Sequence, residues 1–378
     1  MPEADDPATG PASAPSRAAD TARRSGWDGA RPPAPLYAAL DLGTNNCRLL
    51  IASPTRQGFR VVEAFSRIVR LGEGLAQTGA LSEAAMDRAA AALKVCGERL
   101  RRRDLTRVQA VATQACRVAR NGPEFLRRVE RETGVRLRVI AAREEAQLSV
   151  AGCLGLLDRS ADAALVVDVG GGSTELSWVD LRGGHLDGAA HVPLERLPIR
   201  AWTSLPVGVV TLAEQYPERH GDPAWFRAMV DAVKARVAAF TLAEPFRRVF
   251  TEGRAHLIGT SGAITSLAGL HLNLTRYERA RVDGLWLSRD DCTAAAERLM
   301  ALPPAERAAQ PCIGPDRADL VLAGAAILQA VQETWPCERV RVADRGLREG
   351  LLLSAMAEAR RGRRSPRPDG RARATAAT

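Results

Sequence analysis

The sequence predicts a two-domain α/β protein whose second domain repeats a motif of the first. Three observations carry this prediction. The chain has 378 residues, enough for two domains of ordinary size. Patterns typical of strands and of helices are mixed along it. Finally, an apolar run that ends in an aspartate and enters a glycine-rich turn occurs twice, at Asp41 and at Asp168.

The composition excludes several classes of protein. No apolar run approaches the roughly 20 residues of a membrane-spanning helix, and residues 1–35 lack a secretory signal, so we expect a cytoplasmic protein without a membrane partner. Only 4% of the residues are aromatic, which disfavours nucleic-acid recognition by stacking. Seven scattered cysteines without a CxxC pair indicate reduced thiols. The five histidines form no zinc motif, so any metal must be held by oxygen.

The first half opens with strands. Turn residues separate three short apolar runs, 37–42, 47–53 and 59–66, which is typical of a meander. Ser82 is a suitable cap for a helix over 84–100, where apolar residues recur at helical spacing. The patterns that follow predict a strand at 108–112, a helix at 123–133, a strand at 137–141 and a helix at 144–156.

The second half restarts the pattern. An apolar run at 163–167 leads into Asp168, a glycine-rich turn and an alternating strand at 175–179, and a helix is expected at 263–270. Both chain ends are rich in Pro, Ala, Ser or Arg and cannot offset their ordering entropy by burial. The predicted organisation is a disordered segment 1–35, domain I at 36–161, domain II at 162–343, a C-terminal helix at 344–360 that packs back on the domains, and a disordered basic tail at 361–378.

The two turns have the composition of phosphate sites. Glycine lets backbone N–H groups approach an oxyanion without a Cβ in the way. The aspartate before each turn would repel a phosphate unless a divalent cation lay between them, which implies Mg²⁺. A plain β-hairpin is the alternative for one turn, but two matching turns favour phosphate. Neither the Gly-Lys-Ser/Thr of a P-loop nor a GxGxxG motif is present.

Further carboxylates accompany the second turn. Asp168 and Glu175 flank it and can project at the same end of a strand pair. Glu144 and Glu145 begin the helix that precedes the second half. A carboxylate at a helix N-terminus can orient water for attack on phosphorus, although such pairs are more often only favourable to the helix dipole.

These residues resemble the exopolyphosphatase/guanosine pentaphosphate phosphatase (Ppx/GppA) family, in a short form without its C-terminal helical domain. That family lies within the acetate and sugar kinase/Hsp70/actin superfamily. The resemblance spans residues 37–355. The matching segments, in order, are 39–46, 112–117 with Asn121 and Phe125, 144–146, 167–175, 259–262, 317–319 with Gly324, and 346–350.

The resemblance implies two actin-like, ribonuclease H-like domains, with the two turns facing each other across an interdomain cleft. It implies Mg²⁺-dependent hydrolysis of terminal phosphate from inorganic polyphosphate, with Glu145 activating the water. Asp168 and Glu175 would position Mg²⁺ and the attacking water, with Asp41 as a further metal ligand. The implied phosphate-binding residues are Gly43, Thr44, Asn45, Asn46, Gly170, Gly171, Gly172, Ser173 and Arg117.

Several alternatives stay open at this point. The substrate of the same chemistry could be guanosine pentaphosphate, cut by a 5'-phosphohydrolase. A kinase with a small acceptor, or a non-catalytic actin-like sensor of nucleotide or polyphosphate, would use the same fold. The sequence leaves the oligomeric state open, with a homodimer as one alternative. The first turn reads Gly-Thr-Asn-Asn, where many relatives carry Gly-Ser-Asn-Ser.

Overall fold

The computed structural model describes residues 34–56, 58–183, 186 and 192–364. The predicted disordered segments 1–35 and 361–378 lie mostly outside the described residues, but residues 361–364 are helical, so the second prediction was wrong there. The C-terminal helix differs from its predicted bounds: α14 spans Leu347–Arg364, so it begins three residues later and extends four residues further than expected. Residues 344–346 form the turn that leads into this helix.

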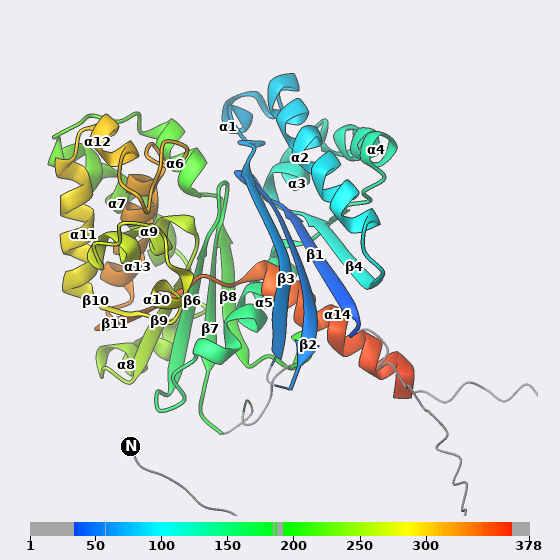
Figure 1. The fold of residues 1–378 in the computed structure, drawn as a ribbon. Helices are drawn as coiled ribbons and strands as arrows, with labels where there is room; N and C mark the ends of the chain where they lie inside the picture. Colours follow the sequence, from blue (N-terminus) through cyan, green and yellow to red (C-terminus); the bar gives the residue numbers. More distant parts are fainter. Residues whose placement is uncertain (1–33, 57, 184–185, 187–191, 365–378) are drawn as a thin grey trace, which may run out of the picture. The chain divides into compact units, whose positions relative to one another are not determined.

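The strands of the described residues form two sheets with the same order of corresponding strands (Figure 1). The first sheet has the order β3-β2-β1-β4-β5 and the second the order β10-β11-β9-β6-β7-β8. The hairpin β1-β2 corresponds to β6-β7, and the parallel neighbours β4 and β9 follow in the same positions. Their bounds are β1 (Leu36–Leu42), β2 (Asn46–Thr55), β3 (Gly58–Ile68), β4 (Leu105–Ala112), β5 (Arg138–Val139), β6 (Ala163–Val169), β7 (Thr174–Asp180), β8 (Ile199–Leu205), β9 (Ala255–Thr260), β10 (Trp286–Ser288) and β11 (Arg339–Ala343).

The helices cover both faces of each sheet. Apolar side chains of α2 and α4 form one core with the outer face of the first sheet, and those of α7, α9, α11 and α13 form another with the second sheet. Of the other helices, α5 and α14 have 12 and 18 residues, and the rest have four to seven. The bounds are α1 (Leu75–Thr78), α2 (Glu83–Arg101), α3 (Gln114–Val118), α4 (Gly122–Thr133), α5 (Ala142–Cys153), α6 (Val209–Gln215), α7 (Pro223–Ala238), α8 (Arg247–Thr251), α9 (Gly262–His271), α10 (Arg279–Val282), α11 (Arg289–Ala301), α12 (Pro304–Ala308), α13 (Val321–Thr334) and α14 (Leu347–Arg364).

Most predicted elements occur close to their expected bounds. The hydroxyl of Ser82 caps α2 by accepting from the Ala85 N–H at 3.3 Å. The clearest difference is β5, where only two residues of the predicted strand 137–141 pair with β4. The seven cysteines are buried free thiols, as the sequence indicates. Within the described residues, no helix is both long and apolar enough to cross a membrane.

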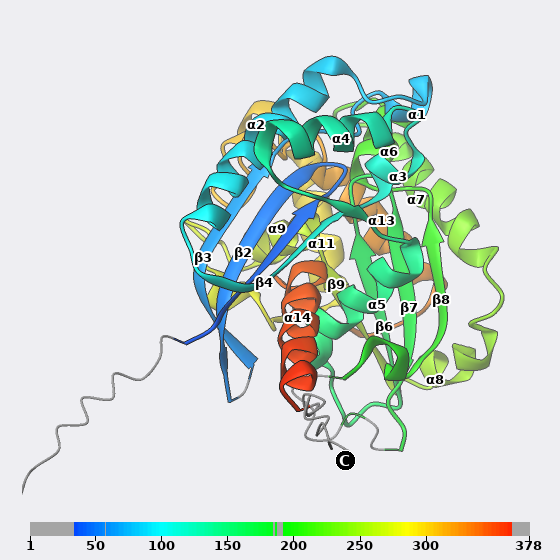
Figure 2. The same ribbon diagram turned by 90° about the vertical axis from the view of Figure 1, so that its right-hand side faces the viewer.

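Helices α5 and α14 lie side by side between the two sheets (Figure 2). Apolar residues of α14 pack on the inner face of the first sheet, whereas those at the end of α5 pack on the second. The helices touch through backbone. A Cβ atom on Gly152 would lie 2.0 Å from the Gly346 carbonyl oxygen, and one on Gly350 would lie 2.1 Å from that of Leu148. Only glycine allows this approach.

Candidate active site

The two glycine turns have the same geometry and lie against each other. In the first, the Gly43 N–H donates to the Asn46 carbonyl at 2.8 Å, and in the second the Gly170 N–H donates to the Ser173 carbonyl at 2.9 Å. A Cβ atom on Gly171 would lie 3.0 Å from that of Thr44. The sequence repeat therefore produces two equivalent hairpin turns that face one another.

The turns line one cavity of about 690 Å³. Of the residues predicted for the site, Asp41, Glu145, Asp168 and every phosphate-binding residue of both turns reach its wall. Arg117 and Glu175 do not line the cavity. The N-cap and first residues of α9, Ser261–Ala263, and the first residues of α14, Leu347–Glu349, also line the cavity. Helix N-termini favour anionic ligands.

Glu145 is placed in the cavity by α5 and by Arg117. The guanidinium of Arg117 donates to Glu145 Oε2 at 3.0 Å, to the Ile140 carbonyl at 2.8 Å, and to Gln114 Oε1. Arg117 thus lies behind Glu145 and holds it, and direct contact of Arg117 with substrate stays a prediction. Glu144 points elsewhere, because Arg138 binds both of its oxygens at 2.7 and 2.8 Å outside the cavity.

Burial raises the pKa of the four carboxyl groups that the sequence predicted for the site, Asp41, Glu145, Asp168 and Glu175. The pKa of Asp41 rises to about 6, because burial outweighs the opposing charges of Arg48 and Arg348. The pKa of Glu175 rises to about 7 through burial and the neighbouring charge of Asp168. Burial also raises the pKa of Glu145 well above its usual value, and the charge of Glu175 is the second largest cause of this increase. Asp41 and Glu175, with pKa values of about 6 and about 7, can therefore ionise near neutral pH when a cation favours the charge.

Asp168 and Glu175 face each other across β6 and β7. Burial raises the pKa of Asp168, whereas a hydrogen bond from Ser149 lowers it. Ser149 is buried one turn after Glu145 on α5 and donates to Asp168 Oδ2. The hydroxyl of Ser204 donates to Glu175 Oε1 at 2.8 Å. The sequence analysis did not single out Ser149, because only the packing of α5 on β6 brings it to Asp168.

Replacing Glu175 with glutamine should stabilise the protein at alkaline pH. The pKa of Glu175 lies near 7 in the folded protein and at 4.5 as a free group, so the folded state retains a proton that the unfolded chain releases. The free energy of unfolding therefore falls as pH rises through this window. In urea unfolding without divalent cations, the free energy of unfolding of Glu175→Gln should exceed that of the wild type by about 3 kcal/mol at pH 8.5 and match it at pH 4.5. A stability gap independent of pH would contradict this.

The oxygen atoms of the site suit Mg²⁺ only in part. Asp41 Oδ1 is buried without a hydrogen-bond partner, and the nearby charge of Asp168 raises the pKa of Asp41. A shared cation would satisfy both carboxylates. Within the described residues, however, no three His, Cys, Asp or Glu side chains are grouped as a metal site. This fits an ion that one or two carboxylates hold together with water and substrate phosphates, as is usual for Mg²⁺.

Three arginines that the sequence analysis did not assign to the site converge in the cavity: Arg48, Arg317 and Arg348. The pKa of Arg48 is lowered by burial first and then by the charges of Arg348 and Arg317, so the three guanidinium groups are near one another. Among the described residues, no carboxylate forms an ion pair with Arg48 or Arg317. A cluster of like charges in which only Arg348 has a carboxylate partner suits a polyanionic ligand.

The internal repeat in the sequence could have predicted that Arg48 belongs to the site. It stands opposite Asp41 on β2, just as Glu175 stands opposite Asp168 on β7. Aligning the two halves would therefore have pointed to it. The equivalent positions carry opposite charges, Arg48 on β2 and Glu175 on β7.

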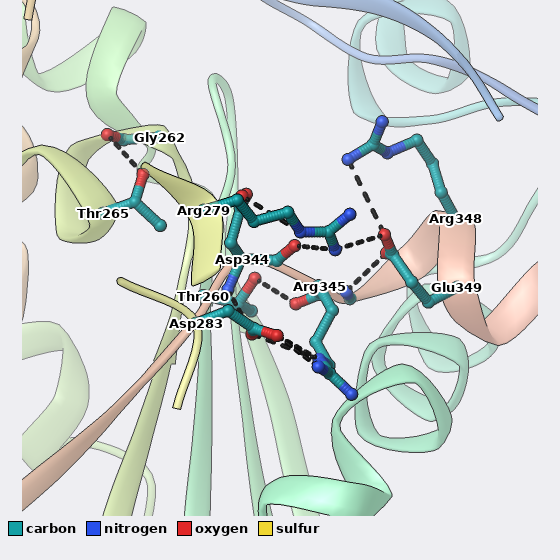
Figure 3. A network of polar contacts seen from close by, with 10 residues as sticks. Thr260, Gly262, Thr265, Arg279, Asp283, Asp344, Arg345, Arg348 and Glu349 are labelled. Atoms are coloured by element: carbon teal, nitrogen blue, oxygen red, sulfur yellow. Dashed lines mark hydrogen bonds and ion pairs between the residues drawn. The ribbon is translucent and has the colours of Figure 1, made fainter. Parts of the chain in front are cut away.

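A polar network fixes the N-terminus of α14 and with it Arg348 (Figure 3). The Glu349 carboxylate lies between the guanidinium groups of Arg279 and Arg348, 3.3 and 3.9 Å away, and accepts from the Gly346 N–H at 2.8 Å. Next to it, Arg345 forms a two-oxygen pair with Asp283, and the Thr260 hydroxyl donates to the Arg345 carbonyl at 2.8 Å.

Comparison with known proteins identifies the family of this chain. The sequence profile of the Ppx/GppA phosphatase family matches residues 50–359. Exopolyphosphatase 2 of Mycobacterium tuberculosis is 30% identical over 330 residues, which cover 84% of this chain and 97% of that protein. Guanosine-5'-triphosphate,3'-diphosphate pyrophosphatase of Photobacterium profundum is 30% identical over 343 residues, covering 87% of this chain and 61% of that protein.

The fold agrees as well. The crystal structure of the Aquifex aeolicus member of the Ppx/GppA protein family superposes with a TM-score of 0.68 at 26% identity, covering 86% of this chain and 98% of that one. The two corresponding sheets have the fold of the Ppx/GppA structures, and the relatives identify the class of protein as a phosphoanhydride hydrolase. The chain belongs to the Ppx/GppA phosphatase family.

Proposed function

We propose that this protein is a Mg²⁺-dependent exopolyphosphatase that releases the terminal phosphate of inorganic polyphosphate. One observation carries the proposal: a single cavity brings the carboxylates of Glu145 and Asp168 together with two glycine turns and three converging arginines. Hydrolysis at the end of a polyanion requires carboxylates that hold a metal ion and orient water. It also requires positively charged side chains that bind the phosphate chain.

Each group has a part in the proposed reaction. The backbone N–H groups of the two turns bind the terminal phosphate, and Arg48, Arg317 and Arg348 neutralise the phosphates behind it. Glu145, held by Arg117, accepts a proton from the attacking water. The leaving group is the shortened chain. Mg²⁺, bound through Asp41 and Asp168, would supply charge neutralisation on the phosphate oxygens. The assignment of Glu175 as a further metal ligand stays a prediction.

Two relatives with different named activities give two candidate substrates for the same chemistry. This chain spans nearly the whole of the mycobacterial exopolyphosphatase but less than two thirds of the Photobacterium pyrophosphatase. The two are equally similar in sequence, so guanosine pentaphosphate remains the second candidate. The purified protein should be incubated with each compound and with ATP, with and without Mg²⁺, and orthophosphate measured. Release from polyphosphate that requires Mg²⁺ and no acceptor supports the proposal, whereas binding without turnover supports a sensor.

Removing the converging arginines should weaken substrate binding more than turnover. A hydrogen bond to a charged group contributes about 1.5–3 kcal/mol, so Arg48→Ala and Arg317→Ala should each raise KM for polyphosphate at least roughly tenfold. The salt dependence of KM should also become shallower. Steady-state kinetics at two salt concentrations checks this, with the exposed Arg219→Ala as the control. Unchanged KM values would remove these arginines from the substrate site.

The cytoplasmic location and the homodimer are also proposals. The sequence analysis gave both as expectations, and size-exclusion chromatography with light scattering tests the second.

A further inference from the structure

Arg70 connects the two sides of the cavity. It follows β3 in the first half, and its backbone N–H donates to the Asn45 carbonyl of the first glycine turn at 3.1 Å. Its guanidinium crosses to the second half, where it donates to both oxygens of Asp319 at 2.7 and 3.0 Å and to the Asp316 carbonyl at 3.2 Å. One residue thus contacts a phosphate turn and a distant segment at once.

On the first side, the loop that contains Arg70 supports the phosphate turn. The Val69 N–H also donates to the Asn45 carbonyl, at 2.8 Å, and the Gly72 N–H donates to the Thr44 carbonyl at 2.9 Å. The loop packs so closely that a Cβ atom on Gly72 would lie 2.2 Å from Thr44 Cγ2. A shift of this loop would therefore move the turn.

On the second side, the Arg70 guanidinium holds a segment that carries Arg317. Asp316 and Asp319 flank this arginine, which lines the cavity. Arg317 lies beside the start of α9, since a Cβ atom on Gly262 would be 3.7 Å from its guanidinium carbon. Because Arg70 binds residues on both sides of Arg317, it restricts the position of Arg317.

The backbone of Arg70 indicates that this arrangement is imposed by its contacts. Its φ of 47° lies in the left-handed region, which residues other than glycine seldom adopt without compensating interactions. In this conformation the Arg70 N–H group binds the Asn45 carbonyl in the first half, while the side chain binds Asp319 in the second. The Arg88 guanidinium adds support from α2 by donating to the Val69 carbonyl at 3.0 Å.

We propose that Arg70 is a positioning residue for substrate binding, which sets the separation between the Thr44–Asn45 turn and Arg317 so that both hold one phosphate chain. This inference rests on the proposed function. Arg70 itself is not among the residues that line the cavity, so it acts through the turn and through Arg317. Its planar guanidinium suits the two oxygens of Asp319, which an ammonium group cannot bind in the same way.

The test compares Arg70→Ala, Arg70→Lys and Asp319→Asn with the wild type. Coupling between two parts of a binding site commonly changes affinity about fivefold or more. Arg70→Ala should therefore raise KM for polyphosphate at least about fivefold, with kcat changed less than about twofold. The KM of Arg70→Lys should lie between those of Arg70→Ala and the wild type. The exchange of charges in Arg70→Asp/Asp319→Arg should recover part of the lost affinity.

The control is Arg227→Ala, which breaks a comparable two-oxygen pair. Arg227 on α7 binds both oxygens of Glu333 on α13 at 2.6 and 2.7 Å, outside the cavity. If Arg70→Ala raises KM no more than Arg227→Ala does, or lowers kcat alone, the inference is overturned. Calorimetric binding of tripolyphosphate gives a reading without turnover, in which Arg70→Ala should weaken affinity by the same factor. A wild type that binds tripolyphosphate but hydrolyses neither substrate would contradict the proposed function and leave this binding test valid.

Discussion

Glu145→Gln should lower phosphate release by about 10²–10⁴-fold while leaving the fold and phosphate binding intact. Glutamine keeps the size of the side chain but cannot accept the proton of the attacking water. Phosphate binding depends on the turns and arginines, which this change does not touch. Orthophosphate release measures the loss, and calorimetry with tripolyphosphate measures the retained affinity.

Glu144→Gln is the matched control, because Glu144 is the neighbouring carboxylate, is bound by Arg138, and lies outside the cavity. It should retain wild-type activity. The pH profile gives a second reading. Burial raises the pKa of Glu145 well above its usual value, so the acid limb of kcat/KM should lie above the ordinary range of a glutamate. Full turnover by Glu145→Gln would assign the base to another group.

Gly152→Ala should reduce the free energy of unfolding by about 3 kcal/mol and also lower activity. The added methyl carbon would stand 2.0 Å from the Gly346 carbonyl oxygen, so α5 and α14 would have to separate. Glu145 lies on α5 and Arg348 on α14, and their relative placement depends on this contact. Thermal and urea unfolding measure the first effect and orthophosphate release the second.

Gly155→Ala provides the comparison for this change. Gly155 follows α5 closely, and a Cβ atom there would meet only Arg345 Nη1, at 3.8 Å. That variant should be nearly as stable and active as the wild type. Equal stability of Gly152→Ala and Gly155→Ala would show that the two helices can adjust without cost.

The sequence predicted the elements whose causes are local. Alternating or continuous apolar runs identified the hairpins β1-β2 and β6-β7, and Ser82 identified the start of α2. It also located both glycine turns, because glycine and aspartate after an apolar run are visible without knowledge of the partner. The strand at 137–141 was predicted too long, since pairing with β4, which ends at Ala112, limits it to two residues.

The site residues also divide into those that a local sequence pattern identifies and those that only packing brings together. Glu145 and Asp168 were found because they adjoin recognisable local patterns, and the sequence could not separate Glu145 from Glu144 without the resemblance. The pair Arg138–Glu144 separates them in the structure. The hydrogen bond from Arg117 to Glu145 was not foreseen from the sequence, and contact of Arg117 with substrate stays a prediction.

By itself, the sequence determined that two like turns, each preceded by an aspartate, occur in a duplicated α/β chain. Only the tertiary structure decided which arginines meet there, that Ser149 reaches Asp168, and that Arg70 joins Asn45 to Asp319. These contacts join residues far apart in the chain, Arg70 and Asp319 among them, and depend on how helices and loops pack. Local propensity and periodicity carry no information about such distances, because the packing of whole elements sets them.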